Sequence, residues 1–191
     1  MSTFNVYMTG VGGQGIGMLS EILLRAADHA GLTVKSVDTH GLAQRGGIVI
    51  SQLRIGEDAR TPLISAQSAD LVVALERHEA LRGARTALKQ GGVLIYYDTV
   101  WQPLPVRLGE EAEVTAADIQ RICQARQARL IQVESSDMTD VRMQNMVMLA
   151  QIARQGLISQ LSPKHFLQAM GDLMDGALLE ANQVIFEEQR Q

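Results

Sequence analysis

The chain has 191 residues, of which 46% are hydrophobic and 20% charged, and its formal net charge at pH 7 is −4. This composition predicts one globular domain over residues 1–191, and the acidic balance argues against nucleic acid as the main partner, which would favour a basic surface. No apolar run approaches the ~20 residues of a membrane span, and the N-terminus lacks the pattern of a secretion signal, so a cytoplasmic protein without membrane contact is expected.

The chain opens with a strand, a glycine-rich turn and a helix. An apolar run at residues 4–8 breaks into the turn, and apolar side chains then recur at helical spacing from about Ile16 to Ala30. The turn has G-x-G-x-x-G spacing: the first glycine permits a tight bend, the second lets a ligand approach the backbone, and the third allows close packing of helix on strand. The candidate cofactor-binding residues of this turn are Gly10, Gly12, Gly13, Gln14 and Gly15.

Two interpretations of this turn are open. The N–H groups at the start of the helix, with the positive end of the helix dipole, suit a phosphate or another anion. The simpler alternative is that the glycines only form a sharp connection from strand to helix. A P-loop for nucleoside triphosphates is excluded, because no Lys-Ser/Thr pair follows the glycines.

A second polar segment with several glycines follows the next strand. The strand covers residues 33–37, and the ten residues from Asp38 to Gly47 are predicted to form a loop. A loop of this composition is hard to explain unless it has a function. Because both segments follow strands, they are expected to face each other at the carboxyl edge of the sheet. The candidate cofactor-binding residues of the loop are His40, Gln44, Arg45, Gly46 and Gly47.

The third strand, at residues 47–56, departs from a simple doubly wound pattern. The connection before it is too short to contain a crossover helix, so it cannot run parallel to the second strand. We therefore predict an antiparallel strand at the edge of the sheet.

The rest of the chain alternates apolar strands with amphipathic helices and ends in a helical tail, from about residue 138 to 191, packed on the sheet. This alternation predicts a three-layer α/β sandwich with a Rossmann-like, mostly parallel sheet. Residues 138–155 carry an apolar, methionine-rich stripe too broad for one exposed amphipathic face. The expected elements are a strand at 70–75, a helix at 76–89 closed by Gly91-Gly92, a strand at 93–97, a helix from 115 or 116 to 128, a strand at 130–133, and helices at 138–155, after Ser162-Pro163, and at 176–188.

The second strand and its loop allow several chemistries. Asp38 lies close to where a dinucleotide-binding fold places its ribose-binding acid, but the usual second crossover helix does not follow it. Arg45 could bind an anionic group or form an ion pair with Asp38. His40 could act as an acid or base, or could anchor its loop. Because no nucleophile accompanies it, we assign no catalytic residue.

The histidines and the cysteine carry no further site. The four histidines are dispersed without the i, i+3 or i+4 spacing of metal ligands, so no metal site is predicted, and His29 and His78 are expected at the surface. The single cysteine, Cys123, rules out an internal disulfide and a cluster held by four thiolates of this chain. Its polar helical context indicates a helix residue rather than a nucleophile.

Taken together, these segments resemble a known family. The resemblance is to the gamma domain of 2-oxoacid:ferredoxin oxidoreductases, and most closely to the beta subunit of its indolepyruvate-oxidising members, and it covers nearly the whole chain. One departure is Ala150, where the family commonly has glycine. The matching segments are Gly10–Gly15, Thr39–Gly47, Ser51-x-Leu53-Arg54-Ile55-Gly56, Asp70–Glu76, Lys89–Gly92 and Arg142-x-x-Asn145-Met146-Val147-Met148-Leu149.

The resemblance implies one subunit of a thiamine-diphosphate enzyme that oxidatively decarboxylates a 2-oxoacid, such as indolepyruvate or another aryl pyruvate, to acyl-CoA and reduces ferredoxin. The chain lacks the Gly-Asp-Gly…Asn motif for thiamine diphosphate and the cysteines for iron–sulfur clusters. These cofactors, with Mg, are therefore expected on a large alpha subunit, coenzyme A is the cosubstrate, and the isolated chain is expected to be inactive. Self-association of the isolated chain stays open.

Two other classes of function remain in view. One is a stand-alone, Rossmann-like oxidoreductase that binds NAD(P) itself. The other is a binding module whose glycine turn senses a metabolite without chemistry. The identity of the 2-oxoacid is not fixed by the sequence.

Overall fold

The computed structural model describes residues 3–40, 47–101, 106, 108–109, 112–134 and 143–191. Six strands form one sheet in the order β2-β3-β1-β4-β5-β6. The strands are β1 (Phe4–Val11), β2 (Val34–His40), β3 (Ile48–Ile55), β4 (Ala69–Ala74), β5 (Leu88–Tyr97) and β6 (Arg129–Val133). The helices are α1 (Ile16–His29), α2 (Arg77–Thr86), α4 (Ala116–Ala125), α5 (Gln144–Arg154), α6 (Pro163–Leu173) and α7 (Gly176–Arg190).

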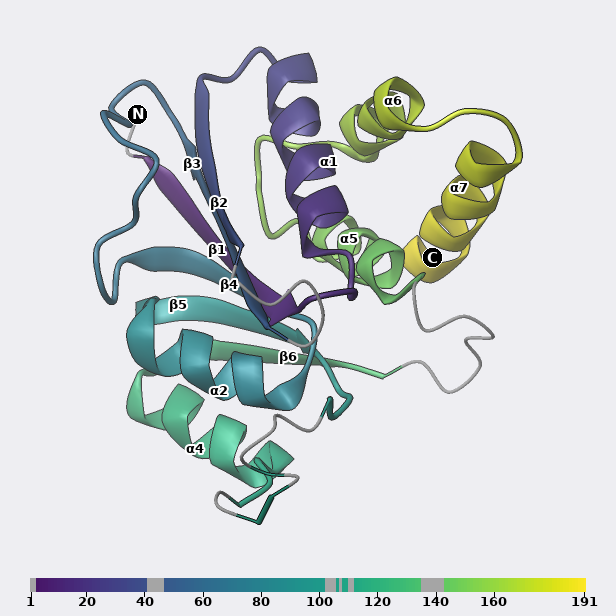
Figure 1. The fold of residues 1–191 in the computed structure, drawn as a ribbon. Helices are drawn as coiled ribbons and strands as arrows, with labels where there is room; N and C mark the ends of the chain where they lie inside the picture. Colours follow the sequence, from purple (N-terminus) through teal and green to yellow (C-terminus); the bar gives the residue numbers. More distant parts are fainter. Residues whose placement is uncertain (1–2, 41–46, 102–105, 107, 110–111, 135–142) are drawn as a thin grey trace.

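Helices cover both faces of this sheet. Helices α1, α5, α6 and α7 lie on one side, and α2 and α4 lie on the other (Figure 1). Successive residues of β1 serve the two sides, because side chains alternate along a strand: Val6 and Met8 pack with α1 and α5, whereas Tyr7 packs with α2. Every strand except β3 runs in the same direction. The predicted three-layer, mostly parallel α/β sandwich is confirmed.

Strand β3 is antiparallel, as predicted, but it does not lie at the edge. It pairs with β1 from Phe4↔Ile55 to Val11↔Ile48, and with β2 on its other side. Its Leu53 and Ile55 are buried under α1, so this strand has a core face that an edge position would leave less covered. The edge strand is β2, which continues to His40; residues 38–40, predicted as loop, are paired strand.

The two glycines predicted to close the second helix have a different role. Helix α2 ends at Thr86, and β5 begins at Leu88, so Gly91 and Gly92 lie inside the strand. The pairing with β4 shifts there, which marks a β-bulge. Gly91 has φ +70°, and a Cβ at Gly92 would come 3.2 Å from two backbone oxygens of β4. These residues are glycines because of the bulge.

Several helices begin where the sequence signals them. Thr115 and Asp118 form a reciprocal capping box at the start of α4. Ser162 precedes Pro163 at the first position of α6, where proline's missing N–H is not needed. The predicted helical tail is confirmed for the described residues after 142. Within it, residues 146–150 of α5 are at most 1% exposed, so the described part of the methionine-rich stripe is core. No helix in the described part of the chain is long and apolar enough to span a membrane.

Candidate functional site

The two segments that carry the predicted site meet at the carboxyl end of β1. Val11 at the end of β1 pairs with Ile48 at the start of β3. One residue beyond, the Gly12 N–H donates to the Gly47 carbonyl oxygen at 2.8 Å. The prediction that the two segments face each other is therefore confirmed for their described residues. Gln44, Arg45 and Gly46 lie outside the described residues, and His40 is the last residue of β2.

The side chain of Gln14 holds the glycine turn from inside. It is 1% exposed, its Oε1 accepts from the Val11 N–H at 2.7 Å, and its Nε2 donates to the Leu75 carbonyl at 3.0 Å. Leu75 follows β4, so this amide bridges the ends of β1 and β4. Helices α1 and α2 leave these two strands on opposite faces, which makes this the topological switch point of the sheet, where open α/β folds bind ligands. In this structure the Gln14 side chain spans the two strand ends there.

The glycines of the turn have distinct roles. Gly10 lies within β1, where a Cβ would come 2.9 Å from Ile16 Cγ1. Gly13 has φ +102° and is exposed, with no atom within 4 Å of a Cβ position. Gly15 has φ +85°, and a Cβ there would lie 2.6 Å from Asn145 Nδ2. The third glycine was expected to let α1 pack on a strand, but its close contact is with α5, because Asn145 reaches the turn.

The start of α1 is open. Its N-cap is Gly15, which has no side chain to accept from the first turn, and that turn holds no acidic residue. The first bond back to the turn is from the Leu19 N–H to the Gly15 carbonyl at 3.0 Å. The N–H groups of Ile16, Gly17 and Met18 bond to no described residue, and Gly17 and Met18 are exposed. Uncapped N–H groups with the positive dipole end of a helix bind oxyanions.

The neighbouring helix start carries two buried carboxyl groups that sequence reasoning did not single out. Glu76 is fully buried, and its side chain accepts from the Glu79 N–H at the start of α2. Its second oxygen has no partner among the described residues, and burial raises the pKa of Glu76 to about 7. Glu79 accepts from the Thr9 hydroxyl at 2.6 Å. The signal was present: an acidic residue directly before a helix and another three positions later resemble a capping pair.

Asp38 is an exposed residue of β2, and its Oδ1 lies 3.4 Å from the Ser20 hydroxyl of α1. His29 is exposed, as predicted, and pairs with Asp172 at 2.7 Å. His78 is buried, which contradicts the surface prediction; its Nε2 accepts from the Val114 N–H at 3.4 Å, in the segment that precedes α4. Among the described residues, no group of three or more His, Cys, Asp or Glu is placed to hold a metal ion.

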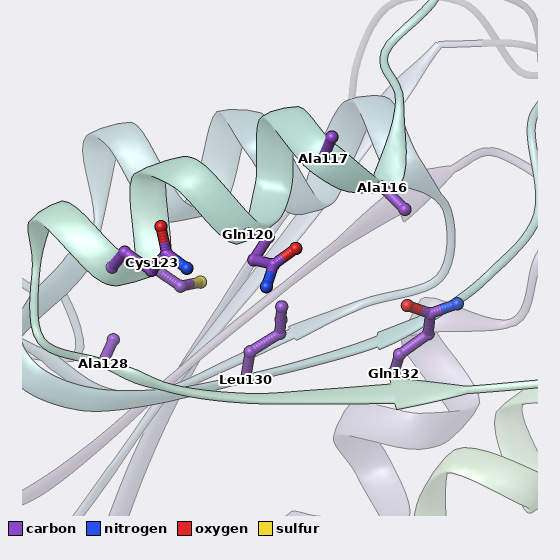
Figure 2. A pocket seen from close by; sticks show the side chains of 8 residues that line it. Ala116, Ala117, Gln120, Cys123, Ala128, Leu130 and Gln132 are labelled. Carbon is purple, nitrogen blue, oxygen red and sulfur yellow. The ribbon is translucent and has the colours of Figure 1, made fainter.

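A cleft of about 520 Å³ lies elsewhere, between α4 and the edge strand β6 (Figure 2). Cys123 and Gln120 project from α4, and Leu130 and Gln132 from β6. Burial raises the pKa of the Cys123 thiol to about 11, so a thiolate nucleophile is disfavoured and the predicted helix role holds. β4 and β5 separate this cleft from the glycine turn, so the two are distinct places.

The sequence of the chain matches one family profile over residues 5–191, that of the pyruvate ferredoxin/flavodoxin oxidoreductases. The chain belongs to this family. The resemblance recognised in the sequence is thereby confirmed.

Curated relatives carry a more specific name. The indolepyruvate oxidoreductase subunit IorB of Archaeoglobus fulgidus is 50% identical over 91 residues, which are 48% of this chain and 45% of the relative. The subunit of the same name from Thermococcus kodakarensis is 35% identical over 122 residues, 64% of this chain and 60% of the relative. The chain thus spans about half the length of these relatives.

Solved structures share the fold. The PORC subunit of Thermotoga maritima pyruvate oxidoreductase has a TM-score of 0.68 at 18% identity, covering 100% of this chain and 96% of its own. The gamma subunit of a keto/oxoacid ferredoxin oxidoreductase from Geobacter sulfurreducens gives 0.64 at 18% identity, with 98% and 96% covered. The 2-oxoglutarate:ferredoxin oxidoreductase of Magnetococcus marinus, solved with 2-oxoglutarate, coenzyme A and succinyl-CoA bound, gives 0.68 at 17% identity over 100% of this chain and 31% of its own.

Proposed function

We propose that this chain is the small subunit of a thiamine-diphosphate-dependent 2-oxoacid:ferredoxin oxidoreductase that converts indolepyruvate, or another aryl pyruvate, to acyl-CoA. Family membership over residues 5–191 carries the proposal. The name shared by the relatives at 50% and 35% identity supports an aryl pyruvate as the oxoacid.

The redox cofactors are proposed to lie on a large partner subunit. Thiamine diphosphate, Mg and iron–sulfur clusters need ligands that this sequence does not supply: its one cysteine is Cys123, buried in α4 with a raised thiol pKa. The purified chain, given thiamine diphosphate, an aryl pyruvate and a viologen acceptor, should show no turnover. Turnover by the chain alone would contradict this division of labour.

The open start of α1 is proposed to bind a phosphate of coenzyme A in the assembled enzyme. Coenzyme A, when bound, supplies the thiol that accepts the acyl group. The residues of this chain fit the phosphate: the N–H groups of Ile16, Gly17 and Met18 lack partners among the described residues, and the first turn holds no carboxylate to repel an anion. Gly12, whose N–H is already bonded to Gly47, serves to shape the turn.

Stand-alone NAD(P) binding is the weaker alternative. The antiparallel β3 stands where a dinucleotide fold would begin its second crossover, and the Gln14 side chain is bonded to the ends of both β1 and β4 at the switch point. A metabolite-sensing module would use the same open helix start. Titration of the isolated chain with NAD(H) and with coenzyme A distinguishes these alternatives, because tight NAD(H) binding would favour the first.

Gly17→Ala tests the coenzyme A site directly. No atom lies within 4 Å of a Cβ built at Gly17, and alanine has a higher helix propensity than glycine, so the fold should tolerate the change. Because Cβ atoms lean toward the helix N-terminus, the new methyl group would stand where the phosphate is proposed to lie. The KM for coenzyme A should rise about tenfold, equivalent to about 1.4 kcal/mol, with the KM for the oxoacid unchanged.

The matched control is Gly171→Ala. Gly171 is also helical and equally free of neighbours, but it lies on α6. The control should keep both Michaelis constants and should be tolerated equally by the fold. An unchanged KM for coenzyme A in Gly17→Ala would remove the proposed site.

The segment from His40 to Gly47 is proposed to contact the large partner or its ligand. Its Gly47 end is bonded to Gly12 of the glycine turn, and its His40 end lies at the same edge of the sheet with β3 between it and β1. Arg45→Ala should reduce co-purification of the large subunit or turnover of the assembled enzyme. Arg60→Ala is the control, because Arg60 is exposed just beyond the opposite end of β3. Normal assembly and normal activity in Arg45→Ala would count against the proposal.

A further inference from the structure

The glycine turn rests against the methionine-rich helix α5 through one side chain. Asn145 Nδ2 donates to the Gly15 carbonyl oxygen over a long 3.5 Å, and a Cβ at Gly15 would collide with the same amide. Gly15 is also the residue whose left-handed conformation, φ 85° and ψ 25°, turns the chain into α1. The residue that sets the direction of α1 is therefore the residue that Asn145 contacts.

The Asn145 amide is itself firmly held. The residue is 6% exposed, and its Oδ1 accepts from the Met146 N–H at 2.9 Å, which turns Nδ2 toward Gly15. The four residues after Met146 are fully buried in the core, so α5 provides a rigid support. Gln14 of the turn itself binds Val11 and Leu75. Two buried amides, one from the turn and one from α5, thus hold the turn.

We propose that Asn145 is a positioning residue for the anion site at the start of α1. It fixes Gly15, and through Gly15 the direction of the N–H groups of residues 16–18, without touching the ligand. A site whose donors are held in place before binding loses less freedom on binding, so its affinity depends on the residues that hold it. The inference rests on the proposed function in one respect, the identity of the anion as a coenzyme A phosphate.

The test uses Asn145→Ala in the assembled enzyme and in the full isolated chain. The KM for coenzyme A should rise about tenfold, while kcat and the KM for the oxoacid change less than twofold. In the isolated chain, hydrogen exchange of the Gln14 and Leu19 amides, which donate to Val11 and Gly15, should become faster, with exchange in α2 unchanged. A variant with a lower melting temperature but wild-type KM for coenzyme A and wild-type exchange at residues 14 and 19 would overturn the proposal, because Asn145 would then contribute only to packing.

A double-mutant cycle sharpens the test. Gly13→Ala and Gly15→Ala both place alanine in a left-handed conformation, but only the residue 15 change collides with Asn145. Asn145→Ala should therefore relieve Gly15→Ala and act additively with Gly13→Ala, in both KM and exchange; additivity in both pairs would overturn the proposal. Faster exchange in Asn145→Ala with no effect of Gly17→Ala on KM would support positioning while rejecting the coenzyme A site. If Gly17→Ala raises the KM for coenzyme A and Asn145→Ala changes neither KM nor exchange, the coenzyme A site would be supported and the positioning role of Asn145 rejected.

Discussion

Helices α1 and α2 begin at equivalent places and solve the same problem in opposite ways. Each follows one of two adjacent parallel strands, β1 and β4, at the same edge of the sheet. At the start of α2, the extended residue Glu76 brings a carboxyl oxygen onto the Glu79 N–H. At the start of α1, Gly15 is left-handed and offers no acceptor. One helix start is satisfied from within, and the other is left for a group from outside the chain.

The side-chain cap at α2 and its absence at α1 separate a structural helix start from one that is free to bind a ligand. The Glu76 carboxyl caps α2 but is fully buried, and burial is the main reason that its pKa rises to about 7. The α1 start avoids a buried charge and leaves exposed N–H donors at Gly17 and Met18. A ligand site in this fold therefore requires that the protein not cap this helix itself.

Replacement of Gly15 should have the largest effect on the α1 start. Alanine there adds a left-handed conformation and a collision with Asn145, so the free energy of unfolding should fall by roughly 2–5 kcal/mol. Gly13→Ala has the conformational penalty without the collision and should lower it by about 1–2 kcal/mol. Urea unfolding of both variants gives the comparison. Equal losses would show that the contact with α5 does not restrict the turn.

The α2 start should make stability depend on pH. Because the pKa of Glu76 is raised in the folded state, its contribution is complete below pH 4.5 and is lost as the pH rises through about 7. For a shift of this size, the loss is roughly 3 kcal/mol. Glu76→Gln carries no proton to lose, so its unfolding free energy should change less between pH 5 and pH 8 than that of the natural chain. Parallel pH profiles from urea unfolding would contradict the buried, protonated carboxyl.

A carboxylate added to the first turn of α1 should convert it toward the α2 type. Met18 is 36% exposed at the third helical position, and Met18→Glu should stabilise α1 by about 0.3–1 kcal/mol through the helix dipole. The same charge should repel an incoming phosphate and raise the KM for coenzyme A about tenfold, about 1.4 kcal/mol. Leu178→Glu is the matched control, at the third position of α7 and 57% exposed. A similar rise in both variants would show that the α1 start is not the anion site.

The comparison also shows which parts of the site could be read from sequence. The strand, glycine turn and helix were predictable because apolar periodicity and glycine spacing are local signals. The role of Gly15 was not, because its neighbour Asn145 lies 130 positions away in the chain. Glu76 was predicted to begin a helix and to end a segment that matches the family, but it was assigned no buried role, since its burial depends on how α2 packs against the sheet.

The wrong predictions about the fold also come from contacts between segments that are distant in the chain. The short connection before β3 correctly required an antiparallel strand. It could not say whether that strand would lie at the edge or inside the sheet, because strand order depends on pairing and burial among segments that are distant in the chain. The pair Gly91-Gly92 has the local look of a helix end, but the bulge that it serves exists only in the pairing of β5 with β4.

The sequence by itself therefore determined the three-layer α/β class, the glycine turn and the family, because these depend on periodicity, spacing and motifs carried by neighbouring residues. The tertiary structure decided the central position of β3, the burial of Glu76 and His78, and the contact of Asn145 with Gly15. The physical reason is that burial, pKa and steric fit are properties of contacts between segments distant in the chain. Only packing around the sheet brings those segments together, and with them the open start of α1.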